Sequence, residues 1–178
     1  HEVVYDFSGV QKHIPLGQLD ITLSGVGTDA PVLTRANAHE YTLVTTADGN
    51  AQVTNFSTSL GLDNYQSAAR GYKLNSVKVN YTIATADITD ITVAVANVTF
   101  AASGATVATP MTATYDTAHD TSAERKTQAD HAMTLTVTTP AVFTTSQQFP
   151  VLEIVLTALN TSVITLRSIV ANYDLLLP

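Results

Sequence analysis

Apolar and polar residues alternate through most of this chain. In residues 77–83 every odd position is apolar and every even position is polar, and residues 91–95 and 133–138 repeat the pattern. A period of two is typical of a β-strand with one buried face, and Thr, Val, Ile and Tyr suit such strands. The 3.6-residue period of a helix is not sustained over three turns anywhere. The pattern therefore predicts an all-β protein.

The same criteria predict further strands at residues 2–7, 19–24, 40–46, 52–57, 105–115, 151–159 and 163–177. Many short strands with short links are typical of two antiparallel sheets packed face to face. We expect a single domain over residues 1–178, a two-sheet antiparallel sandwich of the jelly-roll kind. Residues 25–39 and 117–130 are expected to be loops or to carry short helices.

Turn residues separate several of these strands. Asp48-Gly49 predicts a hairpin between its flanking strands, because both central positions of such a turn favour positive φ. Ser103-Gly104 predicts a second turn. Residues 87–90, rich in Asp, predict a hairpin that joins the strands at 77–83 and 91–95.

Two strands carry extra information. Residues 151–156 are largely apolar on both faces, which predicts a central strand or one covered on both sides. In the last strand the apolar phase shifts from even positions, at Ile164 and Leu166, to odd positions from Ile169 onward. One extra residue near Ser168 would cause this shift, so we expect a β-bulge there.

Charged residues are scarce, at 13% of the chain, against roughly 25% in a typical soluble domain. The net charge is −7, and only eight residues are Lys or Arg. The small group Arg70, Tyr72 and Lys73 is not the basic stripe of a nucleic-acid binder, so direct nucleic-acid contact is not expected. No run of 18 or more apolar residues predicts a membrane span.

Catalytic motifs are missing from the sequence. The chain has no Cys, which excludes thiolate nucleophiles, thiolate metal sites and disulfides. No Gly-x-Ser-x-Gly motif occurs, and Gly25-Val26-Gly27 is not followed by a helical pattern, as a phosphate-binding loop would be. We therefore predict a protein that is not an enzyme, with no catalytic residues and no cofactor.

The densest polar segment, residues 116–131, contains the candidate metal ligands His119, Asp120 and His131. The two histidines are twelve residues apart in an expected loop, whereas zinc ligands usually have short, fixed spacings. The favoured interpretation is a solvated loop with one helical turn, capped by Asp120 or by Thr121 reaching Glu124. No metal site is predicted.

The surface composition points to self-assembly. A free monomer usually displays many charges, but the outward strand positions here are mostly Thr, Ser, Ala and Asn, which cost less to desolvate than ions. Faces of this kind can be covered by neighbouring subunits. The terminal segments could also dock on a neighbour or complete their own sheet. The candidate interface residues are Val3, Tyr5, Leu175, Leu176 and Leu177.

Residues 71–81, 86–89 and 166–174 carry a resemblance to known proteins. They resemble small β-sandwich proteins of phages and environmental viruses. The chain is also similar in size and in its pattern of strand residues to single jelly-roll capsid proteins of tailless viruses. The resemblance implies a role in virion assembly, with no catalytic residues.

Two functions therefore remain open. The first is a virion structural protein, a capsid, decoration or appendage subunit whose partners are copies of itself and other virion proteins. The alternative is an extracellular carbohydrate-binding or adhesion module. Such modules usually stack sugars on exposed aromatic rings, for which Tyr65, Tyr72 and Tyr115 are the candidates in a chain without Trp.

Overall fold

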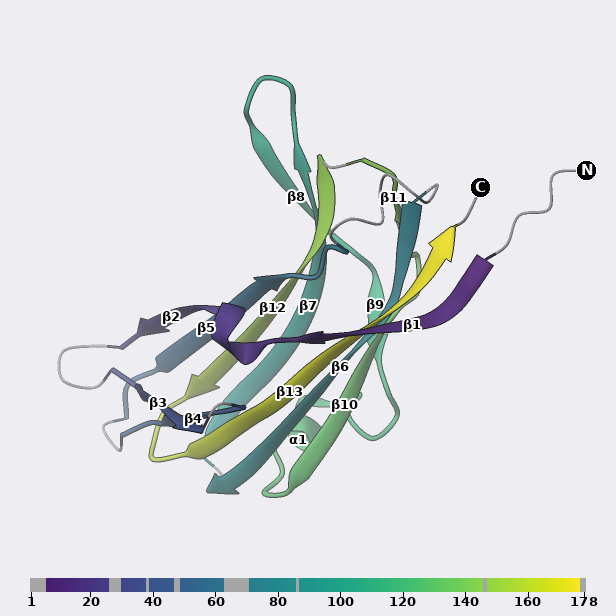
Figure 1. Ribbon diagram of the computed structural model, residues 1–178. Coiled ribbons are helices and arrows are strands. Elements are labelled where there is room, and N and C mark those ends of the chain that lie inside the picture. Colours follow the sequence, from purple (N-terminus) through teal and green to yellow (C-terminus); the bar gives the residue numbers. More distant parts are fainter. Residues whose placement is uncertain are drawn as a thin grey trace, which may run out of the picture.

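Two antiparallel sheets pack against each other in the computed structural model, which describes residues 6–25, 30–37, 39–46, 49–62, 71–85, 87–145 and 147–176 (Figure 1). Among these residues, the first sheet has eight strands. They are β1 (Asp6–Ile14), β3 (Val32–Asn37), β4 (Glu40–Val44), β6 (Gly71–Thr85), β9 (Ala113–Tyr115), β10 (Asp130–Val137), β11 (Val142–Phe143) and β13 (Val163–Leu176).

The second sheet has five strands within the described part of the chain, in the order β2-β5-β12-β7-β8. They are β2 (Asp20–Ser24), β5 (Gln52–Ser59), β7 (Ile88–Phe100), β8 (Thr106–Pro110) and β12 (Gln148–Ala158). A 3-10 helix, η1 (Leu16–Gln18), and a short α-helix, α1 (Ser122–Arg125), complete the described elements. As predicted, β12 is central, between β5 and β7.

Consecutive strands repeatedly cross from one sheet to the other, which confirms the predicted antiparallel sandwich of the jelly-roll kind. Two predicted hairpins are therefore wrong. β4 and β5 lie in different sheets, so the connection through Gly49 crosses between sheets, and Asp48 lies outside the described residues. β6 and β7 are likewise in different sheets, so the turn before β7 is also a crossing. The Ser103-Gly104 hairpin is confirmed, because β7 and β8 pair directly.

A buried glutamine supports the crossing from β4 to β5. The side-chain amide of Gln52 donates to the Thr46 carbonyl at 2.8 Å and accepts from the Thr46 N–H at 3.1 Å. Gln52 is only 1% exposed, and its side-chain amide satisfies the backbone N–H and carbonyl of Thr46, which lies beyond the end of β4.

Other strand boundaries also differ from the prediction. The strand predicted at 2–7 is described from Asp6 and continues to Ile14, and residues 2–5 lie outside the described part. The expected loop at 25–39 contains β3. The single strand predicted at 105–115 is two strands, β8 and β9, which belong to different sheets. Pro110 is the last residue of β8.

The predicted bulge in the last strand is confirmed. Leu166 pairs with Tyr81 and Ser168 pairs with Asn80, so Arg167 is the extra residue of β13. A bulge redirects a side chain. The guanidinium of Arg167 reaches the hydroxyl of Thr82 at 2.8 Å and also the carboxylate of Glu40.

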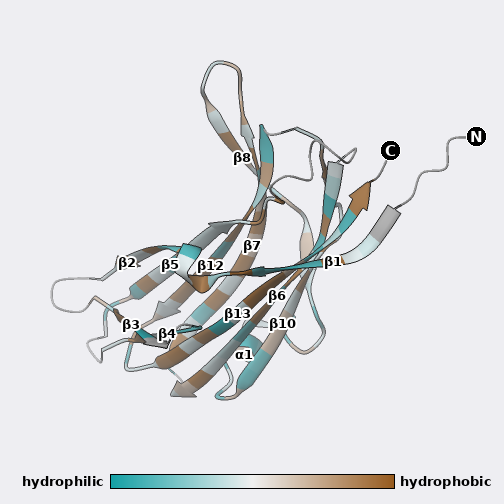
Figure 2. Cartoon of the chain, in the orientation of Figure 1, coloured by the Kyte–Doolittle hydropathy of each residue, from teal (hydrophilic) through white to brown (hydrophobic). Residues whose placement is uncertain are grey.

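The core lies between the two sheets. Hydrophobic residues recur along β6 and β13, the two central strands of the first sheet (Figure 2). Their largest fully buried side chains include Tyr72, Leu74, Ile83, Ile169 and Tyr173. No described helix is long and apolar enough to cross a membrane.

Candidate functional site

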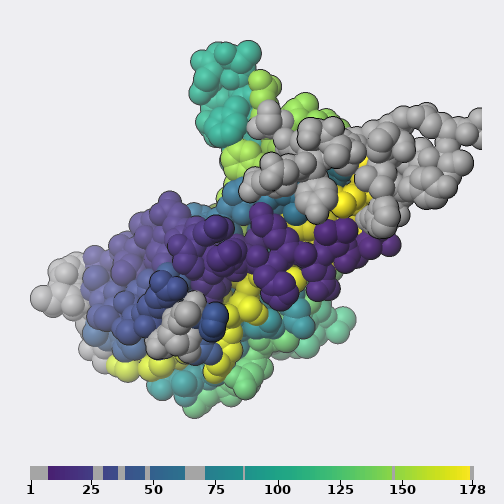
Figure 3. All heavy atoms as spheres, viewed as in Figure 1, coloured from purple at the N-terminus to yellow at the C-terminus, as the bar shows by residue number. Residues whose placement is uncertain are grey.

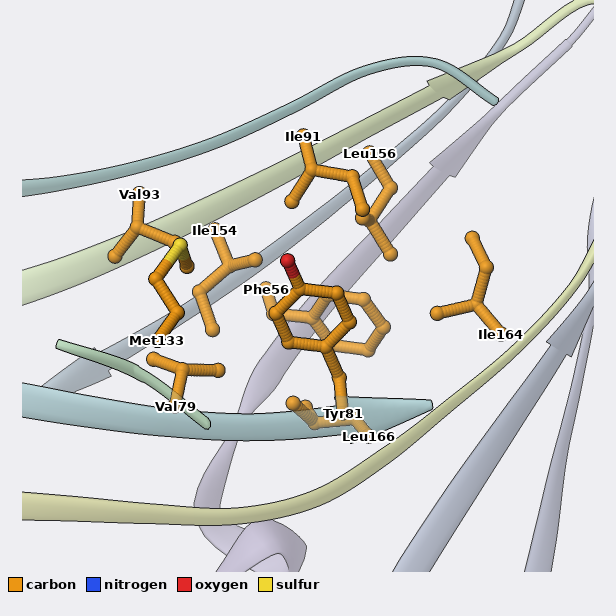
Figure 4. Close-up of a pocket in the computed structure, with 10 residues that line it drawn as sticks. All are labelled: Phe56, Val79, Tyr81, Ile91, Val93, Met133, Ile154, Leu156, Ile164 and Leu166. Carbon is orange, nitrogen blue, oxygen red and sulfur yellow. The ribbon is translucent and has the colours of Figure 1, made fainter. Parts of the chain in front are cut away.

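A small cavity lies between the two sheets. In the view of Figure 4, Val93, Ile154 and Leu156 of the second sheet face Tyr81 and Leu166 of the first. The cavity among them measures about 10 Å³. This is barely the volume that one water molecule needs, so this cavity does not hold a ligand.

The polar segment 116–131 forms the predicted loop with one helical turn. Thr121 caps α1, because its hydroxyl accepts from the Glu124 N–H while the Glu124 carboxylate accepts from the Thr121 N–H. Asp120 is therefore not the cap. A hydrogen bond with Glu124, followed by the charge of Glu124, raises the pKa of Asp120.

Two of the three candidate metal ligands, His119 and His131, lie side by side. Their separation of twelve residues in an expected loop did not predict this contact. His119 Nε2 lies 3.2 Å from His131 Nδ1, and both side chains are buried. The outer nitrogens are also occupied: His119 Nδ1 bonds to Asp116 at 2.7 Å and His131 Nε2 to the Thr127 carbonyl at 2.8 Å. Asp120 does not join them. Among the described residues, no three His, Asp or Glu side chains are placed to hold a metal ion.

Asp116 anchors this chain of hydrogen bonds. Its carboxylate accepts from the backbone N–H groups of Thr134 and Ala118 as well as from His119. Partial burial by itself would raise the pKa of Asp116, but the bonds from Thr134 and His119 outweigh burial and lower the pKa below its usual value. The Asp116 carboxylate therefore ties the loop to the middle of β10 and acts as a structural element.

Substitution Asp116→Asn is expected to lower the free energy of unfolding by about 2 kcal/mol at pH 7, since bonds to a charged acceptor are lost. A carboxyl group with a lowered folded-state pKa stabilises the fold above its unfolded pKa, and this contribution disappears as the pH falls through the folded value. The difference between wild type and variant should therefore shrink below about pH 4. Urea unfolding across this pH range measures it, with the exposed Asp87→Asn as the control. A difference that is constant with pH would contradict the assignment.

Arg125 holds the same loop against the second sheet. Its guanidinium donates to the carbonyls of Ile91 and His119, both at 2.9 Å, and to that of Asp120 at 3.2 Å. It also lies 4.2 Å above the centre of the Tyr115 ring. Arg125 is 7% exposed, so it is a structural clamp rather than a surface cation.

The tyrosines considered as sugar platforms do not form one in the described structure. Tyr72 is fully buried and stacks on Phe143, with ring centres 5.1 Å apart. Tyr115 lies beneath Arg125 and exchanges two hydrogen bonds with the backbone of Val93. Tyr65 lies outside the described residues.

The terminal interface candidates give a mixed result. Leu175 is 7% exposed and belongs to the core, which fits the alternative that this segment completes its own sheet. Leu176 is half-buried and pairs with β1 and β6 of its own sheet. Val3, Tyr5 and Leu177 lie outside the described residues.

The hairpin of β7 and β8 contains an exposed and uncharged strand. All five residues of β8 are exposed, and Val107 is 55% exposed. The hairpin projects from the body as a separate lobe, coloured teal in Figure 3. At its base Phe100, 43% exposed, packs on Phe149 with ring centres 5.4 Å apart. Residues 91–115 form the longest stretch of the sequence without a charged residue.

The outer face of the first sheet carries neutral hydrogen-bonded pairs beside the ion pairs Lys73–Asp174 and Arg167–Glu40. Side-chain hydrogen bonds cross its strands from Asn80 to Ser168 at 2.6 Å and from Asn172 to Ser76 at 3.1 Å. A further contact of 3.2 Å joins the hydroxyls of Thr42 and Thr165. These pairs use up polar groups within the sheet, which lowers the cost of covering the face.

A shallow depression of about 460 Å³ lies where η1 approaches β3 and the bulge of β13. Its polar lining comprises His13, Gln18, Arg35, His39, Arg167 and Ser168. No Phe, Tyr or Trp occurs among the described residues that line it. The depression suits hydrogen bonding or an acidic ligand, and it offers no ring for sugar stacking.

The sequence matches no protein-family model and none of the curated proteins with which it was compared. Several solved structures are similar to it in shape. A family 11 carbohydrate-binding module from Clostridium thermocellum has a TM-score of 0.43 and 8% identity, with 95% of this chain and 96% of that chain covered. A CBM22-1 xylan-binding domain from Paenibacillus barcinonensis has a TM-score of 0.30 and 10% identity, with coverages of 94% and 86%.

A tailspike domain of bacteriophage CBA120 has a TM-score of 0.43 and 5% identity. The alignment covers 88% of this chain but only 20% of that chain. Likenesses at these scores assign no function, so the proposals below rest on the residues and contacts of this chain.

Proposed function

We propose that this chain is a structural subunit that forms repeated contacts with copies of itself, in the manner of a virion protein. The observation that carries the proposal is the β7–β8 hairpin, which projects from the body with β8 wholly exposed and uncharged. Edge strands of free monomers are usually protected by charge, by covering segments or by burial. The open edge of β8 has no charge to protect it, and contact with another subunit would cover this edge.

The distribution of charge supports this proposal. With a net charge of −7, two copies repel each other unless their contacting surfaces are neutral. The segment 116–130 carries six charged residues, and α1 lies at the end of the sandwich opposite to the β8 hairpin (Figure 1). Contacts through the hairpin therefore bring neutral surfaces together and keep this charged segment in solvent.

Light scattering after size exclusion tests the proposal over a range of concentrations. We expect masses that are multiples of 18.9 kDa and that increase with concentration. Val107→Asp should reduce the assembled fraction, because it places a charge on the hairpin. The matched control is Thr117→Asp, which adds the same charge to an exposed loop beside α1 and should leave assembly unchanged. A monomer at every concentration would refute the proposal.

The depression at the β13 bulge favours a second candidate function, binding of an extracellular glycan. Its volume lies within the range of small-ligand sites, and its polar lining includes Arg35 and Arg167. Because stacking rings are lacking there, an acidic oligosaccharide is the better match. Calorimetry with uronic-acid and neutral oligosaccharides tests this candidate. Binding should favour the acidic sugar and weaken in Arg167→Gln but not in Lys126→Gln, and equal binding of both sugars would contradict it.

A further inference from the structure

The free edge of β8 presents a definite set of backbone groups. The Ala101 N–H donates to the Ala105 carbonyl, and the Met111 N–H donates to the Val95 carbonyl, both at 2.8 Å. These two bonds set the phase of the β7–β8 ladder, because hydrogen-bonded and non-hydrogen-bonded pairs alternate in antiparallel sheets. Residues 105, 107, 109 and 111 therefore direct their backbone groups toward β7. Thr106, Ala108 and Pro110 direct theirs away from it, toward the open edge of the sheet.

The composition of this edge suits pairing with an identical edge. β8 is the last strand of the second sheet among the described residues, and it carries no charge. About a two-fold axis the residue on the axis meets its own copy and the residues beside it meet one another, so a charge near the axis would lie close to the same charge of the partner. The opposite edge of this sheet, β2, begins with Asp20. β8 is the edge that meets the requirement for neutrality.

We propose that β8 pairs antiparallel with β8 of a second copy, about a two-fold axis at Ala108, so that two five-stranded sheets become one. This inference rests on the proposed structural role and specifies one contact between two subunits that would serve that role. In this register the Ala108 N–H of each copy donates to the Ala108 carbonyl of the other. The Thr106 N–H of each copy donates to the partner carbonyl at Pro110.

Pro110 agrees with this register. The edge-facing N–H groups of β8 belong to Thr106 and Ala108, because Pro110 has none. Centring the pair on Ala108 uses both donors of each copy and leaves the proline to act as an acceptor. The proline also stops the pairing from extending further, which limits the contact to one short strand of each copy.

Charged substitutions of Ala108 test whether the two-fold axis lies at this residue. In the pair, the two Ala108 side chains lie opposite each other on one face, so Ala108→Glu brings two carboxylates together and Ala108→Lys brings two ammonium groups together. Each variant alone should dissociate about five- to tenfold more readily than wild type. An equal mixture of the two should form a heterodimer at least as tight as the wild-type dimer. Sedimentation velocity measures the affinities, and native mass spectrometry identifies the heterodimer.

The control is Ala94→Lys, matched to Ala108→Lys, at an exposed position on β7 of the same sheet opposite Glu153, which should leave pairing unchanged. If wild type assembles but neither Ala108 variant changes assembly, the β8 pairing is wrong while the structural role stands. If each variant weakens assembly and the mixture does not restore it, β8 contacts a different surface and the two-fold axis is wrong. If wild type is always monomeric, both proposals fail.

Discussion

Replacement of Arg125 by Met is expected to lower the free energy of unfolding by about 4 kcal/mol, because three backbone carbonyls lose their donor. The guanidinium binds the carbonyls of Ile91, His119 and Asp120 and lies over the Tyr115 ring. Met fills much of the same space but provides no N–H group and no cation. Urea unfolding followed by circular dichroism measures the loss.

The neighbouring Lys126 provides a matched control. Lys126→Met removes the same formal charge as Arg125→Met. The ammonium group of Lys126, however, donates to the Thr89 carbonyl at an exposed position. Its effect should stay within about 0.5 kcal/mol. Arg125→Lys should recover only part of the lost stability, since an ammonium group cannot reproduce the planar fork of donors. An equal loss in Arg125→Met and Lys126→Met would show that net charge matters and the buried bonds do not.

Substitution Gly71→Ala is expected to lower the free energy of unfolding by about 3 kcal/mol. Gly71 begins β6 at φ +126°, a conformation that residues with a side chain rarely adopt. A Cβ atom there would lie 2.6 Å from the Phe143 carbonyl oxygen and 3.1 Å from Thr144 Cγ2. The backbone of β11 would have to move away from β6, and the stacking of Tyr72 on Phe143 would be disturbed. Thermal and urea unfolding both measure the cost.

Gly104 separates backbone strain from steric contact. It has φ +83°, but a Cβ atom there would meet no atom within 4 Å. Gly104→Ala should therefore lower the free energy of unfolding by only about 1 kcal/mol, because the positive φ is unfavourable for alanine. If both alanine variants lost the same stability, the close approach of β11 to Gly71 would not be the cause.

These stability variants also serve the assembly experiments. Arg125 and α1 lie at the end of the sandwich opposite to the β8 hairpin (Figure 1). A variant that loosens the loop near His119 but keeps the fold should therefore still assemble. If Arg125→Met abolished assembly while the protein remained folded, the contact surface would have to lie near α1 and not at β8.

The candidate assembly surface was only partly predictable from the sequence. The lack of charge in residues 91–115 can be read directly, and it supported a surface built for covering. Whether β8 is covered by its own molecule depends on how far the first sheet extends beneath it. Residues 105–115, which the sequence predicts as one strand, form two strands that separate after Pro110. Of these two strands, only β9 joins the first sheet. This division leaves β8 uncovered.

The histidine pair shows the same limit. His119 and His131 are far apart for loop residues, and the sequence favoured a solvated loop without contact between them. The capped turn of α1 and the start of β10 fold back on each other, and Asp116 bonds to the Thr134 N–H to hold them there. Contacts of this kind depend on the path of a loop, for which the residues carry no periodic signal.

The sequence by itself determined the β class, the positions of most strands, the central place of β12, a turn capped by Asp120 or Thr121 and a bulge near Ser168. Each of these follows from alternation, a phase shift or a side chain acting on its immediate neighbours, and such effects act over a few residues. Only the tertiary structure decided which strands pair. Turn residues such as those before β5 and β7 allow a reversal whether the next strand joins the same sheet or crosses to the other. Burial of the core between the sheets makes that choice, because it depends on strands far apart in the chain.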